Sequence, residues 1–190
     1  MSENFFIHNY LEDFSNLVKP NQKIIKKIID VKKIFLRIKK NKKKIIIFGN
    51  GGSAAIASHV SVDLTKNSKI RCVNFNEADL ITCFSNDFGY EHWIEKAIEY
   101  YGDKGDAVIF ISSSGKSKNI LNGCLAAKKK SIKIITFSGH SNRNPLSKFG
   151  EINFWAPSKS YNYIECLHLI WLLTIVDLII GKREYSSKLK

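Results

Sequence analysis

The stretch IIIFGNGGSAAIASHVSVDL, residues 45–64, joins an apolar run to an amphipathic one through a glycine-rich loop. Residues 45–48 form the short β-branched run that is typical of a strand buried on both faces. Gly49-Asn50-Gly51-Gly52-Ser53 follows directly, and glycines let the backbone turn sharply and approach a ligand closely. A helix predicted over residues 53–65 would direct its free N–H groups at an anion there. The stretch predicts a strand–loop–helix unit of an α/β fold.

Four more short apolar segments recur along the chain, and predicted helices separate most of them. The predicted strands are residues 45–49, 70–75, 107–111, 132–138 and 152–155, and the helices are 53–65, 91–101, 117–130 and 162–180. This alternation predicts a five-stranded parallel sheet with helices on both faces, a doubly wound α/β sandwich. Two more helices are predicted near residues 4–17 and 21–40. We therefore divide the chain into N-terminal, oligomerising helices (1–44) and one α/β domain (45–190).

Most of the net charge of +13 lies between Lys19 and Lys44, where Asp30 is the only acid. Such a block can bind nucleic acid or an acidic membrane. Here, however, the lysines alternate with isoleucines in the pattern of a helix with one solvated face. Only Phe35 and Arg37 could read bases. We therefore expect no nucleic-acid partner.

The expected compartment is the cytoplasm. The four cysteines share apolar surroundings and form no C-x-x-C pair: Cys72, Cys83, Cys124 and Cys166. We expect them to be buried free thiols in a reducing compartment. Acids and asparagines interrupt the apolar residues near the N-terminus, unlike in a signal peptide. The apolar run 167–180 is shorter than the roughly 20 residues of a membrane span, so it predicts a buried helix and no membrane partner.

A second loop, Ser112-Ser113-Ser114-Gly115-Lys116-Ser117, follows the predicted strand 107–111 and opens the next helix. Its four hydroxyls, its glycine and a helix N-terminus supply many donors to the oxygens of a phosphate monoester. A nucleotide P-loop would need a further glycine at its start. A capping turn would need only one or two serines. The loop predicts phosphate binding by four residues: Ser112, Ser113, Ser114 and Ser117.

The first loop leaves a dinucleotide site open as an alternative, because Gly49-x-Gly51-x-x-Ala54 fits that fingerprint. Such a site needs an acid at the end of the second strand to hold a ribose. Residues 70–75 end in Asn and Phe, and acids follow only at Glu77 and Asp79. The dinucleotide alternative therefore has less support than a phosphate site.

Three motifs resemble those of the SIS (sugar isomerase) domain family, and within it the phosphoheptose isomerases. They are residues 49–53, Asn86-Asp87-Phe88-Gly89 and residues 111–117. The resemblance covers nearly the whole chain. It implies a five-stranded parallel α/β fold, aldose–ketose isomerisation of a sugar phosphate for surface-carbohydrate synthesis, and a homo-oligomer, dimer or tetramer, with active sites between subunits. Beside the four serines, it implies these substrate contacts: Asn50, Gly51, Gly52, Ser53 and Asp87.

Isomerisation needs a base near one carbon, an acid or metal at the carbonyl, and a phosphate anchor. In the resembling isomerases, a His and a Glu on the first helix serve a zinc site, and a Gln and a second His on the last helix complete it. Here these positions hold His59, Asp63, Glu165 and Leu173. The resemblance implies His59, Asp63 and Glu165 as zinc ligands, with zinc as the candidate cofactor. It implies Asp63 as a catalytic base. His168 lies one turn past Glu165 on the same helix, and our hypothesis is that it substitutes for the missing His.

Two of these positions depart from the family. Asp63 is shorter than Glu by one methylene, which moves the base roughly 1.3 Å back, and ~1 Å errors can slow a reaction ~100-fold. Leu173 can neither bind a metal nor transfer a proton. His168 has the alternative of a hydrogen-bonded histidine buried in a subunit interface. Two functions stay open: an isomerase with a rearranged acid/base set, or a non-catalytic binding or regulatory SIS-fold protein of the initiator-associating type.

Overall fold

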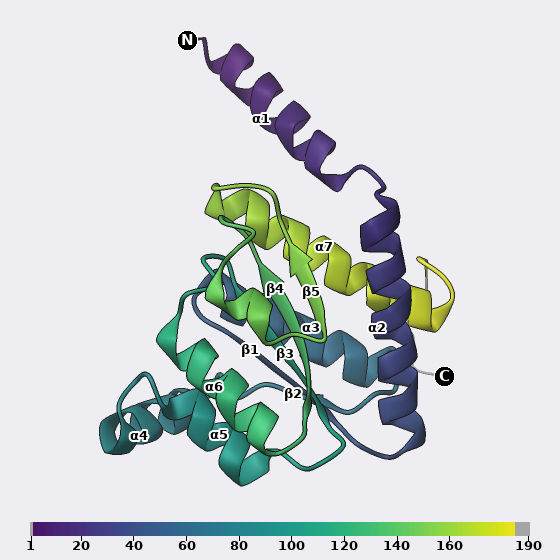
Figure 1. The fold of residues 1–190 in the computed structure, drawn as a ribbon. Helices are drawn as coiled ribbons and strands as arrows, with labels where there is room; N and C mark the ends of the chain where they lie inside the picture. Colours follow the sequence, from purple (N-terminus) through teal and green to yellow (C-terminus); the bar gives the residue numbers. More distant parts are fainter. Residues whose placement is uncertain (1, 185–190) are drawn as a thin grey trace.

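The computed structural model describes residues 2–184. Its centre is a five-stranded sheet in the order β2-β1-β3-β4-β5, and each neighbouring pair is parallel (Figure 1). The strands are β1 (Ile45–Gly49), β2 (Cys72–Val73), β3 (Ala107–Ser112), β4 (Lys133–Ser138) and β5 (Ile152–Trp155). The strand order reverses between β1 and β3, which is where ligands bind in open α/β sheets. The predicted five-stranded doubly wound fold is confirmed.

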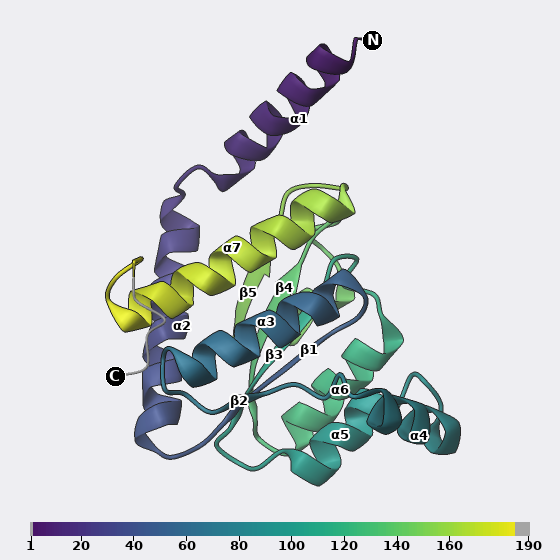
Figure 2. The same ribbon diagram turned by 180° about the vertical axis from the view of Figure 1, so that it is seen from behind.

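Helices cover both faces of the sheet (Figure 2). They are α1 (Glu3–Val18), α2 (Gln22–Lys40), α3 (Gly52–Lys66), α4 (Ala78–Phe88), α5 (Trp93–Tyr101), α6 (Lys118–Lys129) and α7 (Tyr161–Ile180), with a short 3₁₀ helix at Pro145–Lys148. Helices α2, α3 and α7 share one core with Ile45 and Ile47. Helices α5 and α6 share the other with Ile46 and Phe48. Successive strand residues point to opposite faces, so β1 supplies both cores.

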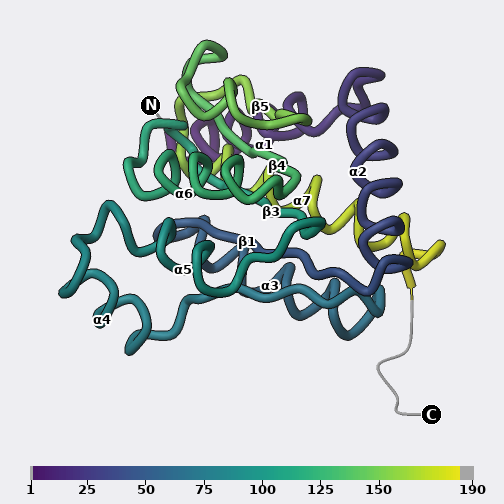
Figure 3. Tube along the Cα trace, turned by 60° about the horizontal axis from the view of Figure 1, so that its bottom comes forward, coloured from purple at the N-terminus to yellow at the C-terminus, as the bar shows by residue number. Residues whose placement is uncertain are grey.

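Two segments differ from the prediction. Strand β2 has two residues instead of the predicted 70–75. Beyond it, Asn74 donates to Ser61 at 2.8 Å and Asn76 donates to Ser58 at 2.8 Å, both on α3, so the chain leaves the sheet there. Helix α4 was not predicted. It lies at the end of the molecule opposite α2 (Figure 3), and only partly buried side chains such as Phe84 pack it against a core.

The two N-terminal helices differ in their contacts. Four α2 side chains are buried in the core of α3 and α7: Ile28, Val31, Phe35 and Ile38. Helix α1 projects away from the sheet (Figure 1), and none of its residues is buried within the described part of the chain. It contacts α7 through Tyr163, whose hydroxyl donates to the carbonyl of Tyr10 at 2.8 Å. Only α1 therefore stands apart from the α/β body.

Helix α7 is the one described helix that is long and apolar enough to cross a membrane by length and composition. Seven of its residues are buried in the protein: Ile164, Leu167, His168, Trp171, Leu172, Ile175 and Val176. It packs against α2 and α3. The prediction of a buried C-terminal helix is confirmed for this face only, because Ile170 and Leu178 on the same helix are exposed.

The thiols are not all buried. Cys72 and Cys124 are buried, whereas Cys83 on α4 and Cys166 on α7 are exposed. The expectation of four buried cysteines is therefore wrong for two of them. Both lie on helix faces turned away from the cores, where apolar neighbours in the sequence do not imply burial.

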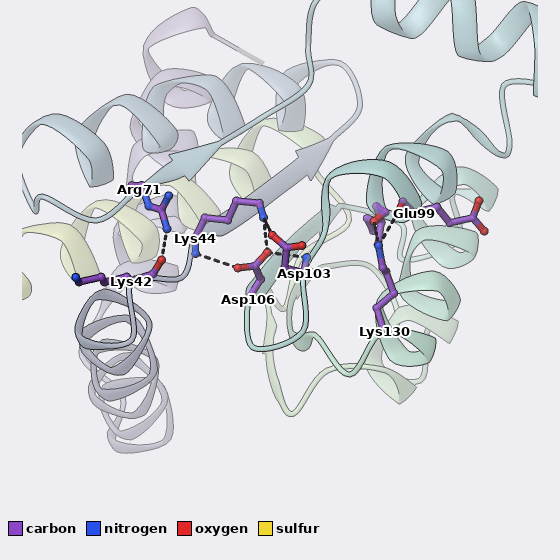
Figure 4. A network of polar contacts seen from close by, with 8 residues as sticks. Lys42, Lys44, Arg71, Glu99, Asp103, Asp106 and Lys130 are labelled. Carbon is purple, nitrogen blue, oxygen red and sulfur yellow. Dashed lines mark hydrogen bonds and ion pairs between the residues drawn. The ribbon is translucent and has the colours of Figure 1, made fainter.

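The buried carboxylate of Asp106, just before β3, binds Lys44, just before β1 (Figure 4). Asp106 is 1% exposed and forms an ion pair of 2.7 Å with the ammonium of Lys44. It also accepts the backbone N–H groups of Lys44 and Asp103, at 3.0 and 2.9 Å. The Lys44 ammonium lies 2.8 Å from the Asp103 carboxylate as well. This network fixes the end of the sheet opposite the two loops.

Candidate functional site

The two loops meet in one cavity at the carboxyl ends of β1 and β3. Its volume is about 160 Å³, and its lining is Asn50, Ser53, Ile111, Ser112, Ser113, Ser114, Ser117, Tyr161 and Glu165. Helix α3 begins at Gly52 and α6 begins at Lys118, directly after the two loops. The first N–H groups of a helix lack intrahelical acceptors, so two helix N-termini present donors and positive dipole ends here. The cavity is suited to an anion.

The hydroxyls of the phosphate loop, residues 112–117, are not used to cap α6. Ser117 is the N-cap residue, but within residues 2–184 its side chain makes no capping hydrogen bond. Its Oγ lies 3.2 Å from the Oγ of Ser112 instead. The Oγ of Ser113 is buried and has no hydrogen-bond partner among the described residues. A buried hydroxyl without a hydrogen-bond partner is destabilising. A bound ligand could supply the missing partner in this loop.

Asn144 packs against Gly115 of the phosphate loop. It was not identified from the sequence. It is 1% exposed, and its amide donates to Ser138 at 3.0 Å and to the carbonyl of Ser141 at 2.8 Å. Gly115 lies against it with a φ of +64°, and any Cβ there would overlap the Asn144 side chain. The glycine of the phosphate loop is therefore required by both its backbone conformation and this contact.

The glycine loop, residues 49–53, brings α3 close to α7. Gly51 is the N-cap of α3 and has a φ of +55°. A Cβ on Gly52 would overlap the carboxylate of Glu165. The absence of a side chain at Gly52 thus allows Glu165, from the first turns of α7, to line the cavity.

Asn50 is fixed by two residues that the sequence analysis did not identify. Its amide pairs reciprocally with that of Asn119, at 3.0 and 2.9 Å. Asn119 is 2% exposed. The hydroxyl of Tyr90 donates to Asn50 Oδ1 at 3.2 Å. An asparagine in the first turn of the helix after the phosphate loop was the available signal for Asn119, because short polar side chains there often bind backbone or loop groups.

Asp87 lies at the end of α4 and is exposed. It accepts the side-chain amide of Asn86 at 3.0 Å. The cavity lining within residues 2–184 does not include it. Tyr90, three residues later, connects this segment to Asn50. A substrate contact of Asp87 stays a prediction.

His59 and Asp63 lie on one face of α3, as their spacing predicted. His59 Nε2 is 3.4 Å from Asp63 Oδ2, and the His59 side chain is 53% exposed. Asp63 also accepts the amide of Asn67 at 3.0 Å. Neither residue is among those of the described chain that line the cavity. Glu165 does line it, and burial raises the pKa of its carboxyl above the usual range.

Comparison with known proteins identifies the family, because the SIS domain model matches residues 9–139. The chain belongs to the SIS domain family. It is 31% identical over 173 residues to a phosphoheptose isomerase of Sulfurimonas denitrificans, and the aligned region covers 88% of each protein. It is 33% identical over 187 residues to one of Buchnera aphidicola, covering 95% of this chain and 92% of that protein. Its fold matches that of the phosphoheptose isomerase from Neisseria gonorrhoeae with a TM-score of 0.87, at 22% identity, over 94% of this chain and 99% of that one.

In this SIS domain, His168 lies in the core. It is fully buried, and its Nε2–H donates to the carbonyl of Ser138 at 3.0 Å. Burial lowers its pKa to about 4, against the smaller opposing effect of that hydrogen bond. Phe137 contacts the ring edge-on at 5.7 Å between centroids. The described cavity lining excludes His168, and the residue is buried and hydrogen-bonded within the core of one chain rather than in a subunit interface.

The candidate zinc ligands of the SIS domain are not brought together by one chain. Among residues 2–184, no three His, Cys, Asp or Glu side chains gather closely enough to hold a metal ion. His59 and Asp63 are neighbours, but Glu165 lies in the cavity. Leu173 packs partly buried against the core of α3 and α7. A single chain therefore does not fit the zinc site that the family implies.

Proposed function

We propose that this chain is a sugar-phosphate isomerase of the phosphoheptose isomerase type, which anchors the phosphate of its substrate in the cavity of the two loops. The observation that carries the proposal is the buried Ser113 hydroxyl, which has no partner within residues 2–184. Ser113 lines the cavity together with three further serines of the same loop. Relatives that cover most of the chain at 31–33% identity are named phosphoheptose isomerases.

The size of the cavity limits it to the phosphate end of the substrate. At ~30 Å³ for each water, about 160 Å³ holds roughly five waters. A phosphate group fits in that space, because its four oxygens are bonded to one phosphorus and occupy less volume than four separate waters. The carbons that react would lie outside, beyond the side chains at the rim.

We propose Asp63 as the base that moves the proton between neighbouring carbons, with His59 holding its carboxylate. The pair lies on a solvent-facing part of α3, so a site that used it would be completed by another surface. We propose that this surface is a second copy of the chain. Helix α1 supports such a homo-oligomer, because it exposes several large apolar side chains: Phe5, Phe6, Ile7 and Leu11.

Zinc stays a proposal, and it would require donors from more than one chain. His59 and Asp63 would supply two ligands, and Glu165 or a group of another copy would supply the rest. No step of the proposed reaction depends on it. We also propose a cytoplasmic location, which agrees with free thiols at the exposed Cys83 and Cys166.

A second function, binding of a phosphosugar without catalysis, is favoured by the two departures from the family. Leu173 takes part in core packing rather than in the cavity. Asp63 is shorter than the family's glutamate. A binding or regulatory protein would need the phosphate-binding residues but no acid or base at positions 63 and 173.

Incubation with sedoheptulose 7-phosphate and a panel of related ketose phosphates in D₂O, with and without zinc, distinguishes the two functions. An isomerase incorporates deuterium next to the carbonyl, and the Asp63→Asn variant loses this activity while it still binds inorganic phosphate. We expect Asp63→Glu to raise the rate by up to ~100-fold, because it restores the reach of the base. Phosphosugar binding with no deuterium exchange in any substrate would reject the isomerase and support the second function.

A further inference from the structure

His140 lies just beyond the carboxyl end of β4, beside the cavity. Its backbone N–H donates to the carbonyl of Ser158 at 2.9 Å, in the segment that leads into α7. The preceding Gly139 donates its N–H to the carbonyl of Ser113 at 2.8 Å. These two hydrogen bonds hold His140 between the phosphate loop and the start of α7.

The backbone at His140 is left-handed, with a φ of 50°. Few residues other than glycine adopt this conformation, although His, Asn and Asp do so more often than most. A Cβ on Gly139 would overlap the side chain of Ile164, so the turn packs directly against α7. The turn therefore fixes where the His140 side chain is attached, next to the start of α7.

The imidazole of His140 contacts the ring of Tyr161 edge-to-face, with the ring centroids 5.0 Å apart and the planes at 62°. This is a favoured geometry for two aromatic rings. The buried His140 Nε2 has no hydrogen-bond partner among the described residues, and the imidazole packs against the Tyr161 ring. Tyr161 lines the cavity together with Ser114 and Glu165, and it is 57% exposed. It thus forms part of the open rim.

We propose that Tyr161 binds the part of the substrate next to the phosphate, and that His140 is the positioning residue that holds its ring at the rim. The proposal rests on the proposed function and adds to it the chemistry of the ligand beyond the phosphate. Because the cavity holds a phosphate group but not a whole sugar phosphate, the attached carbon chain leaves it at the open rim, where Tyr161 lies. A tyrosine ring presents an apolar face to C–H groups and a hydroxyl to a neighbouring OH. The matching ligand is a phosphorylated polyhydroxy chain.

The dissociation constants of glucitol 6-phosphate and of inorganic phosphate, measured by calorimetry on the full chain, test this inference. Glucitol 6-phosphate has the required chemistry but no carbonyl, so it cannot be isomerised. We expect Tyr161→Ala and His140→Asn each to weaken its binding about 3- to 10-fold, the size of one aromatic contact. Phosphate binding should change by less than about 2-fold. Asn tolerates the left-handed backbone, so His140→Asn removes the ring without straining the turn.

The matched control is His8→Asn, which removes an exposed histidine of α1 and should change neither constant. If His140→Asn leaves glucitol 6-phosphate binding unchanged, or weakens phosphate binding equally, the inference is wrong. A wild-type protein that binds both ligands but isomerises no sugar phosphate contradicts only the proposed isomerase activity. A wild-type protein that binds neither ligand contradicts both proposals.

Discussion

The hydroxyls of Ser112 and Ser117 lie 3.2 Å apart, at the two ends of the phosphate loop. Ser117 occupies the N-cap position of α6 but turns its side chain toward Ser112 and not toward the first N–H groups of the helix. The N–H of Ile120 donates to Asn119 Oδ1 at 2.9 Å instead, so the Ser117 hydroxyl is not needed as a cap. This relationship separates an anion site from an ordinary capping turn, and the predictions below begin with it.

Replacement of Ser113 by Ala should weaken phosphate binding while it stabilises the free protein. The variant removes a buried hydroxyl that has no partner within the described residues, and such a group costs about 1–3 kcal/mol. We expect the free energy of unfolding without ligand to rise by about 1 kcal/mol. The affinity for phosphate should fall about 10-fold. Urea unfolding and calorimetry measure the two effects, with Ser15→Ala on the exposed face of α1 as the control. Parallel losses of stability and affinity would contradict this account.

Gly52→Ala should destabilise the protein through a collision with Glu165. A Cβ at this position would overlap the carboxylate of α7, and overpacking of this kind costs about 1–3 kcal/mol. The double variant Gly52→Ala/Glu165→Ala should recover most of the loss, because the colliding group is gone. A double-mutant cycle from urea unfolding gives the coupling energy. Additive effects of the two substitutions would rule out the contact.

Lys44→Met should be strongly destabilising. It leaves the charge of Asp106, which is 1% exposed, without its ammonium partner, and loss of one member of a buried pair costs about 3 kcal/mol or more. Lys133→Met is the matched control. Its ion pair with Glu151 joins side chains that are 41% and 50% exposed, so we expect a change below about 1 kcal/mol. Similar unfolding free energies for the two variants would show that Asp106 does not need Lys44.

His168 should make stability depend on pH between about 6.5 and 4. Burial lowers its pKa in the folded protein to about 4, whereas an unfolded histidine titrates near ~6.5. Between these values the unfolded state binds more protons, so the stabilising contribution is complete above ~6.5 and is lost as the pH falls toward 4. The difference amounts to about 3 kcal/mol. We expect His168→Gln, which keeps a donor for the Ser138 carbonyl, to remove this part of the pH dependence in urea unfolding. An unchanged slope would show that other groups cause it.

Local sequence patterns located the central strands well. The predicted 45–49 coincides with the central strand β1, because a strand buried on both faces is a continuous β-branched or aromatic run. The predicted 152–155 coincides with the edge strand β5. The prediction was wrong at 70–75, where side-chain hydrogen bonds from Asn74 and Asn76 to α3 replace sheet pairing. Helix α4 was missed; six of its eleven residues are apolar, but none of them is buried within the described part of the chain.

The amino-acid sequence by itself determined the α/β class, the two loops and the residue types that could hold a phosphate, because these depend on neighbours within a few positions. Tertiary structure decided which of them share a cavity. Glu165 joins the serines because Gly52 leaves room for it, whereas His168, only three residues later on the same helix, turns into the core. The structure also showed the roles of Asn119 and Tyr161, which contact Asn50 and His140 from other parts of the chain, and of Asn144, which packs against Gly115.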